Sequence, residues 1–262
     1  MSRKHHHLRL AIPGALALSL ILFACTTVPD AGRSSFNIIP QAHLSQMGLT
    51  EFEKIKSQKK LSQNSTQRAA VRSVAERLKP VVPVQNAHWE FVLFEDSAPN
   101  AFALPGGKVG VNTGIFKVAH NDAQLAAVIG HELAHVVAGH SGERLSTGLL
   151  GAVGAAVIGA AIGGDDTATR NIATGAAGAA VMVGMRSFSR GQELEADRLG
   201  ALYMARAGYD PRQSVTLWKN FADHTRRQGG SRVPAFLSTH PLDSTRIANL
   251  ESFMPRALSE YH

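Results

Sequence analysis

The chain has 262 residues, of which 44% are apolar and 18% are charged, a composition that supports one substantial hydrophobic core and excludes an intrinsically disordered chain. The formal charge is +7, but only 6% of the residues are aromatic, and no basic stripe is interleaved with aromatic side chains. The positive charge therefore does not indicate a nucleic-acid-binding protein, and no nucleic acid is expected among the partners.

The first 24 residues have the pattern of a secretory signal peptide. A basic start precedes an apolar run, residues 8–24, which is short for a transmembrane helix and ends in small residues. The only cysteine of the chain, Cys25, follows at once, and Leu22-Phe23-Ala24-Cys25 resembles a bacterial lipobox. We therefore predict a lipoprotein signal peptide over residues 1–24 and lipidation of Cys25. The alternative is an ordinary signal peptide, or an uncleaved anchor, beside an incidental cysteine.

The segment after the cysteine is small, polar and flanked by prolines, as a tether is. We expect residues 25–40 to connect the lipid to a single domain that spans residues 41–262. Thr26, in place of aspartate, resembles the residue found in lipoproteins sorted to the outer membrane. The predicted location is the periplasmic side of that membrane. A periplasmic or inner-membrane anchored protein is the alternative.

Helices and a small sheet are expected next. One or two helices are predicted up to Lys79, the second from Gln67 and ended by Pro80. Trp89–Phe94 has the composition of a strand. Two further short strands are predicted to form a hairpin around the turn Pro105-Gly106-Gly107, and they cover residues 101–104 and 108–112.

The most informative segment is His131-Glu132-Leu133-Ala134-His135, which lies in an apolar run typical of a helix. Two histidines four residues apart lie about 40° apart around a helix axis, so both imidazoles project from one face. That arrangement suits a tetrahedral divalent ion, most often zinc. Glu132 lies at the edge of the same site, where it can take a proton from a metal-bound water. By itself the motif is also compatible with a pair of surface or capping histidines.

Residues 148–184 are dominated by Gly, Ala, Val, Leu and Ile, interrupted by the polar stretch 165–171. Small residues four apart allow close contact between helices. Three interpretations remain open: a buried helical hairpin, a mobile flap over the active site, and insertion into the membrane. Each apolar run is shorter than the ~20 residues that a membrane span needs.

A second helix is predicted from Ser187 to Leu202, and it carries a cluster of acids. Glu193 and Asp197 share one face of it, whereas Glu195 points elsewhere. Because a catalytic zinc site has three protein ligands and one open position, Glu193 is the candidate third ligand. Asp197, one turn later, is placed to accept the second N–H of a ligand histidine. The alternative for these acids is a solvated charged face.

HELAH followed by ELEAD resembles the signature of the zinc metallopeptidases grouped with HtpX, Oma-type and CAAX prenyl proteases, HExxH plus a downstream ExxAD. The stretches NAFALPGG (100–107), GYDP (208–211) and STHPL (238–242) extend the resemblance over residues 70–255. It is closest to single-domain members of the BepA and LoiP type. The resemblance implies an α+β fold, mainly helical, with a small β-sheet (a zincin, gluzincin-like, metallopeptidase domain) and one Zn²⁺ per chain.

The resemblance also implies roles for residues outside the two motifs. The edge strand beside the zinc helix binds the substrate backbone in such peptidases, and the matching residues here are Asn100, Ala101, Phe102 and Ala103. His240 is a candidate fourth, inhibitory metal ligand, or else a loop histidine that caps a helix. Arg246 is a candidate for binding the substrate carbonyl or the developing oxyanion. His140 lies on a different face of the zinc helix and is expected to be structural.

The sequence thus predicts a zinc-dependent metalloendopeptidase of the bacterial cell envelope. By analogy its substrates are misfolded or stalled envelope and outer-membrane proteins, with the membrane and the outer-membrane assembly machinery as further partners. One alternative is a chaperone-like or scaffolding lipoprotein whose site is closed by zinc and His240, with only occasional proteolysis. Another is an inner-membrane protease that uses residues 148–184 as its anchor.

Overall fold

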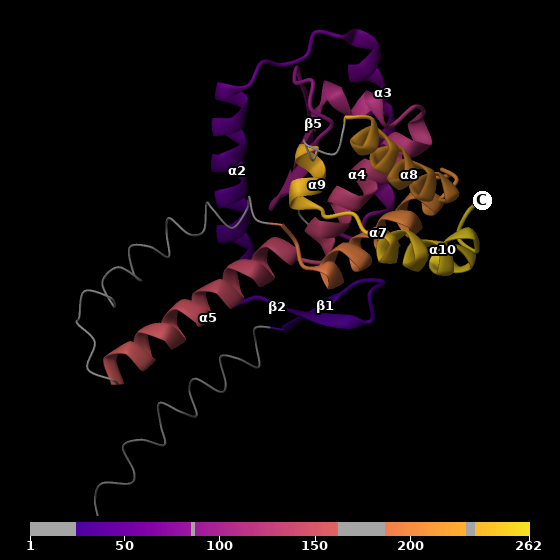
Figure 1. Cartoon of the computed structure of the whole chain (residues 1–262). Coiled ribbons are helices and arrows are strands. Elements are labelled where there is room, and N and C mark those ends of the chain that lie inside the picture. Colours follow the sequence, from indigo (N-terminus) through magenta and orange to yellow (C-terminus); the bar gives the residue numbers. More distant parts are fainter. Residues whose placement is uncertain (1–24, 85–86, 162–186, 229–233) are drawn as a thin grey trace, which may run out of the picture.

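The computed structural model describes residues 25–84, 87–161, 187–228 and 234–262. They form a mainly helical body with two small sheets (Figure 1), so the predicted α+β class is confirmed. The predicted signal peptide, residues 1–24, lies outside the described residues, as do residues 162–184 of the small-residue region.

Two helices cross at the centre of the body. α4 (Asp122–Val137) begins at Asn121, whose side chain accepts a hydrogen bond from the backbone of Gln124. α7 (Arg190–Arg206) begins with a reciprocal capping box between Ser189 and Gln192. Every residue of α4 from 124 to 135 is buried, and this explains its nearly continuous apolar sequence.

Glycines allow α4 and α7 to approach at van der Waals distance. A Cβ atom on Gly200 would lie 2.9 Å from the backbone nitrogen of His131, and one on Gly130 would lie 3.2 Å from the carbonyl oxygen of Gly200. A side chain at Gly200 would force the backbones apart, and one at Gly130 would make a tighter contact than most Cβ atoms do. The crossing therefore places the acids of α7 directly against the histidines of α4.

The other helices surround this pair. The helix predicted from Gln67 to Lys79 is confirmed as α3 (Ser65–Leu78), and two longer helices, α8 (Arg212–Arg227) and α10 (Ser244–Leu258), follow α7. The remaining helical elements are α2 (Gln41–Gln58), α5 (His140–Ala161), the short α9 (Ala235–Thr239), and the 3-10 helices η1 (Lys79–Val81) and η2 (Thr113–Lys117).

A three-stranded sheet lies beside α4. Its order is β3 (Glu90–Phe94), β5 (Lys108–Asn112) and β4 (Ala101–Leu104), with β3 parallel and β4 antiparallel to β5. The predicted hairpin is confirmed, and β4 is an edge strand that contacts α4. Asn112 N donates to Asn100 O at 2.9 Å, and this sets the register. The N–H and C=O groups of Ala101 and Ala103 consequently point away from β5, toward the free edge.

The structure corrects the prediction of a tether directly after Cys25. β1 (Cys25–Val28) and β2 (Arg33–Phe36) form an antiparallel hairpin that lies beneath α7 in Figure 1. Val28 is 2% exposed and belongs to the hydrophobic core. The Arg206 guanidinium holds the hairpin turn through Asp30, at 2.7 Å. The small polar composition of this segment hid its long-range ion pairs, which no local pattern reveals.

α5 leaves the body and extends away from it (Figure 1), so residues 148–161 of the small-residue region are helical. Among the described residues, no helix is both long enough and apolar enough to cross a membrane. The three interpretations of residues 148–184 remain open for the portion beyond Ala161.

The glycine crossing generates a first prediction. Gly200→Ala is expected to destabilise the protein by about 1–3 kcal/mol, because the added methyl group presses on the backbone of His131 and overpacking of a core has that cost. Chemical denaturation of the metal-free protein measures the change. Gly148→Ala on α5, where an added Cβ meets no atom within 4 Å, is the control and is expected to be neutral or slightly stabilising. Equal stabilities of the two variants would contradict the tight crossing.

Candidate metal centre

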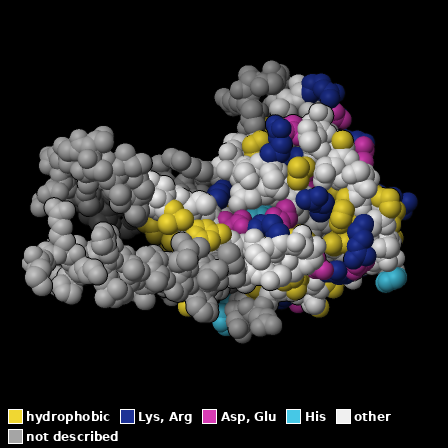
Figure 2. All heavy atoms as spheres, turned by 90° about the horizontal axis from the view of Figure 1, so that it is seen from below, with side chains coloured by type: hydrophobic (Ala, Val, Ile, Leu, Met, Phe, Trp, Pro, Cys, Tyr) yellow, Lys and Arg dark blue, Asp and Glu magenta, His cyan; other side chains and the backbone are white. Residues whose placement is uncertain are grey.

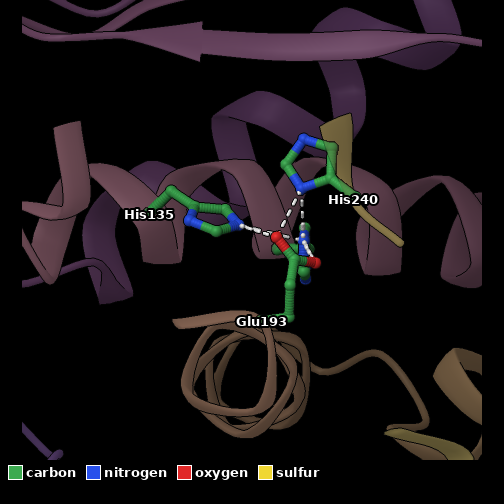
Figure 3. A group of neighbouring side chains, drawn as sticks. His135, Glu193 and His240 are labelled. Atoms are coloured by element: carbon green, nitrogen blue, oxygen red, sulfur yellow. Dashed lines mark hydrogen bonds and ion pairs between the residues drawn. The ribbon is translucent and has the colours of Figure 1, made fainter. Parts of the chain in front are cut away.

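Four side chains from three elements converge in the interior. His131 and His135 come from α4, Glu193 from the first turn of α7, and His240 from the residue that ends α9. Each offers one ligand atom, and these atoms lie within 4.8 Å of one another. Figure 3 shows the Glu193 carboxylate rising from α7 toward the imidazoles of His135 and His240. All four residues are buried, so the group is not a chance surface cluster.

Five of the distances within this group are close to the edge length of a tetrahedral zinc site. His131 Nε2 lies 3.1 Å from His135 Nε2, 3.2 Å from His240 Nδ1 and 3.4 Å from a Glu193 oxygen. The other Glu193 oxygen lies 3.0 Å from His240 Nδ1 and 3.4 Å from His135 Nε2. Ligand atoms about 2.0–2.1 Å from a central zinc ion would stand about 3.3–3.4 Å apart in a tetrahedron. Three imidazoles and one carboxylate therefore fit zinc in both chemistry and spacing.

The surroundings favour positive charge at the centre of this group. Burial lowers the pKa of His131, but hydrogen bonds to Asp197 and Glu193 outweigh burial and raise it to about 9. Burial raises the pKa of Glu193, but its hydrogen bonds to His131, His135 and His240 dominate and hold the pKa far below its ordinary value. Burial holds the pKa of His135 well below its usual range. The site thus combines an ionised carboxylate with a neutral imidazole, as a cation site requires.

Asp197 lies next to His131, one of the two histidines of α4. The Asp197 carboxylate lies 3.0 Å from His131 Nδ1, which leaves Nε2 directed at the other three side chains. Burial alone would raise the pKa of Asp197, but Arg246 and His131 lower it. The carboxylate is therefore ionised, and once a metal displaces the proton from His131 Nε2, it accepts the hydrogen bond of the proton that stays on Nδ1.

Sequence reasoning missed the residues behind His135. His140 Nδ1 lies 2.8 Å from His135 Nδ1, and His140 Nε2 lies 3.1 Å from the Glu195 carboxylate. His140 was expected to be structural and Glu195 to point elsewhere. Gly139, at φ 66°, reverses the chain between α4 and α5 and returns His140 to the zinc helix. The glycine before His140 was the one local signal of this return.

Glu132 lies next to the metal-binding group and is 2% exposed. Burial raises the pKa of its carboxyl, and the charges of His240 and His131 lower it less. One carboxylate oxygen is 3.4 Å from His240 Nε2, and the Ala103 backbone of β4 hydrogen-bonds to the carboxylate. Glu132 therefore lies between the four-residue group and the free edge of the sheet. A carboxylate with a raised pKa in that position is suited to accept and return a proton.

The structure does not support the predicted role of Arg246 in binding a substrate carbonyl. The side chain is 1% exposed, and two of its nitrogens bind the Asp197 carboxylate at 2.7 and 2.8 Å. The third nitrogen lies 2.8 Å from Glu193 and donates to the carbonyl oxygen of His240 at 3.3 Å. All three nitrogens are engaged within the protein, so Arg246 neutralises two buried acids instead of facing a substrate.

The position of Arg246 yields a second prediction. Arg246→Met is expected to destabilise the metal-free protein by about 3–5 kcal/mol, because it leaves buried carboxylates without their counter-charge. Urea denaturation measures the loss. Arg190→Met is the matched control, because Arg190 pairs with Asp243 while its own side chain is 70% exposed. The control should change stability by less than about 1 kcal/mol, and a comparable loss in both variants would refute the buried role.

A family model and several curated proteins match most of this chain. The sequence model described as Peptidase family M48 matches residues 65–254, a range that includes all four residues of the candidate metal centre. The chain is 33% identical over 234 residues to the protein named Mitochondrial metalloendopeptidase OMA1 from Schizosaccharomyces pombe, a match that covers 88% of this chain and 66% of that relative.

Two further relatives have similar levels of identity. The protein named Beta-barrel assembly-enhancing protease from Escherichia coli K12 is 30% identical over 230 residues, which cover 85% of this chain and 46% of that protein. The protein named Metalloendopeptidase OMA1, mitochondrial, from Homo sapiens is 29% identical over 241 residues, with 88% and 46% covered. The chain thus spans about half to two thirds of the length of these relatives.

Proposed function

This chain belongs to peptidase family M48, and from this premise we propose that it is a zinc-dependent endopeptidase that hydrolyses peptide bonds within protein substrates. The observation that carries the proposal is the tetrahedral spacing of His131, His135, Glu193 and His240, with Glu132 beside them. A glutamate next to a zinc site with one exchangeable position is the arrangement that metal-assisted hydrolysis requires.

The side chains divide the chemistry between them. His131, His135 and Glu193 would hold the zinc, which when bound lowers the pKa of a water molecule and polarises a carbonyl group. Glu132 accepts the proton of the attacking water and passes it to the departing amine. Its raised pKa supports this role, since the carboxyl group must both take up and release a proton near neutral pH.

We propose that the substrate backbone binds along β4, at Asn100, Ala101, Phe102 and Ala103. The N–H and C=O groups of Ala101 and the C=O group of Ala103 face the free edge and can pair with an extended peptide by strand addition, while the Ala103 N–H donates to Glu132. Because the Ala103 backbone also contacts Glu132, a peptide bound at this edge would run past the general base.

His240 is proposed to hold the site in a resting form. Its Nδ1 takes the fourth corner of the tetrahedron, and its Nε2 lies 3.4 Å from Glu132. With His240 in this place, neither a water molecule nor a substrate carbonyl can reach the fourth position beside the base. Activation then requires movement of the loop that carries His240.

The proposed setting is the bacterial cell envelope, where a lipid on Cys25 would hold the protein at the periplasmic face of the outer membrane. Support comes from the signal-peptide pattern of residues 1–24 and from the similarity to the E. coli Beta-barrel assembly-enhancing protease. Misfolded or stalled envelope proteins are the proposed substrates, and the outer-membrane assembly machinery is the proposed partner. Loss of maturation in the presence of globomycin would support lipidation, and normal maturation would argue against it.

A scaffolding or chaperone-like role is the second candidate function. The observation that favours it is the position of His240, whose Nδ1 lies 3.2 Å from His131 Nε2 and 3.0 Å from the Glu193 carboxylate, where it can close the site. Under this candidate, partner binding is the main activity and cleavage is occasional.

Glu132→Gln provides the third prediction and separates the two candidates. The amide cannot accept a proton, so we expect casein cleavage to fall by at least about 100-fold, while zinc content by elemental analysis stays near one per chain. Cleavage at the parent rate would reject the proposed mechanism. If a strain lacking the parent gene is complemented by the variant, the scaffolding function is favoured over proteolysis.

The fourth prediction concerns His240. His240→Ala is expected to raise the rate of casein cleavage, by about tenfold if closure is worth about 1.4 kcal/mol, because the fourth position opens while three ligands still bind zinc. Elemental analysis checks that zinc is retained. His88→Ala, at an exposed and distant histidine, is the control and should leave the rate unchanged. An unchanged or lower rate in zinc-loaded His240→Ala would contradict the inhibitory role.

A further inference from the structure

A hydrogen-bonded chain of side chains runs from the N-terminal hairpin to the metal centre. Arg33 of β2 binds Glu195 of α7, Glu195 binds His140 at the start of α5, and His140 binds His135. We call these four residues the His135 relay. His140 is 0% exposed and Glu195 is 8% exposed, so water does not compete for the inner contacts. The relay lies on the opposite side of His135 from Glu193.

The relay fixes the position of each proton. His135 Nε2 must be free of hydrogen to bind a metal, so its Nδ1 carries the hydrogen and donates to His140 Nδ1. His140 then carries its own hydrogen on Nε2, which donates to the Glu195 carboxylate 3.1 Å away. Each ring nitrogen has one role, and an ionised Glu195 makes the metal-binding tautomer of His135 the favoured one.

Arg33 holds Glu195 in place. Arg33 Nε donates to both Glu195 oxygens at 2.8 and 2.9 Å, and Nη1 donates to Glu143 of α5 at 2.5 Å. The Glu195 carboxylate thus lies between the Arg33 guanidinium and the His140 ring. Figure 2 views the molecule from below, and acidic and basic side chains gather at the centre of that face. One arginine thus joins the hairpin to both α5 and α7.

The relay is the counterpart of the contacts behind His131. There, the Asp197 carboxylate binds His131 directly and Arg246 holds Asp197. Behind His135, the Glu195 carboxylate acts through His140 and Arg33 holds Glu195. Both histidines of α4 are therefore backed by a carboxylate of α7 and an arginine from a distant part of the chain. The Arg33–Glu195 ion pair is connected through His140 to the imidazole of His135, a metal-binding residue, and this connection indicates a role beyond stability.

We propose that His140, Glu195 and Arg33 are positioning residues for His135, so that the contact of Arg33, on the β1–β2 hairpin, with Glu195 sets the affinity of the centre for zinc. This inference rests on zinc binding at the proposed active site. It extends the metal centre to the residues that directly follow Cys25. Loss of the Arg33–Glu195 contact would then weaken metal binding without touching a ligand.

The test, and the fifth prediction, is the zinc affinity of the whole chain, measured by competition with a chromophoric chelator. His140→Ala is expected to weaken zinc binding by about 10–100-fold, because His135 loses the group that orients it. His140→Gln keeps one acceptor and one donor on a planar group and should recover most of the affinity. The absorption spectrum of the Co²⁺-loaded forms should change in His140→Ala and remain close to the parent in His140→Gln.

The second part of the test compares the two ion pairs that attach the β1–β2 hairpin to α7, Arg33 with Glu195 and Asp30 with Arg206. Arg33→Ala should weaken zinc binding by about tenfold, since it releases Glu195. Asp30→Ala removes the other ion pair of the hairpin, the one with Arg206, and should leave the affinity unchanged. Equal weakening by both variants would show that the hairpin contributes only general stability, and it would overturn the proposal.

Further outcomes keep this inference distinct from the proposed function. Parent-like zinc affinity and Co²⁺ spectrum in His140→Ala would overturn the relay while leaving the peptidase proposal intact. A folded parent that binds no zinc would reject both. If thermal unfolding shows that His140→Ala does not fold, Glu195→Gln takes its place, because it keeps the size of the side chain and removes the charge. Weaker zinc binding in that variant supports the relay, and unchanged binding overturns it.

Discussion

Gly130 and Gly200 let α4 and α7 cross with their backbones in contact, and the metal centre depends on this approach. One helix supplies two imidazoles at a spacing of four residues, and the other supplies Glu193 within 3.4 Å of both. A side chain at Gly200 would press on the backbone of His131, and a separation of even one ångström would take the carboxylate out of a tetrahedron whose edges are about 3.3 Å. Packing at this crossing thus sets the coordination geometry.

Burying three acids of α7 together is unfavourable unless each has a counter-charge. Asp197 is balanced by Arg246, Glu195 by Arg33, and Glu193 by Arg246 with the surrounding histidines. The arginines come from the two ends of the described chain, outside the helices that carry the ligands. The two arginines therefore stabilise the centre electrostatically, although neither is itself a metal ligand.

Arg246 also connects the buried acids to the loop that carries His240. Besides Asp197, it donates to the carbonyl oxygens of His240 and Pro241, at 3.3 and 3.1 Å. The ring of His240 stacks on Phe236, with 4.4 Å between ring centroids. Opening of the fourth metal position would have to break these contacts or swing the imidazole alone. The same arginine thus supports ligand orientation and the closed position of the loop.

The sequence by itself determined what depends on local periodicity. Two histidines four residues apart face one side of any helix, and Asp197 follows Glu193 by one helical turn. Pro105-Gly106-Gly107 forms the turn of a hairpin, whatever the sheet packs against. Tertiary structure alone decided the contacts between distant segments. The return of His140 to His135 depends on the turn at Gly139, and the ion pair of Arg33 with Glu195 joins residues 162 positions apart. Such contacts leave no periodic trace in the sequence, because they follow from how the folded elements pack.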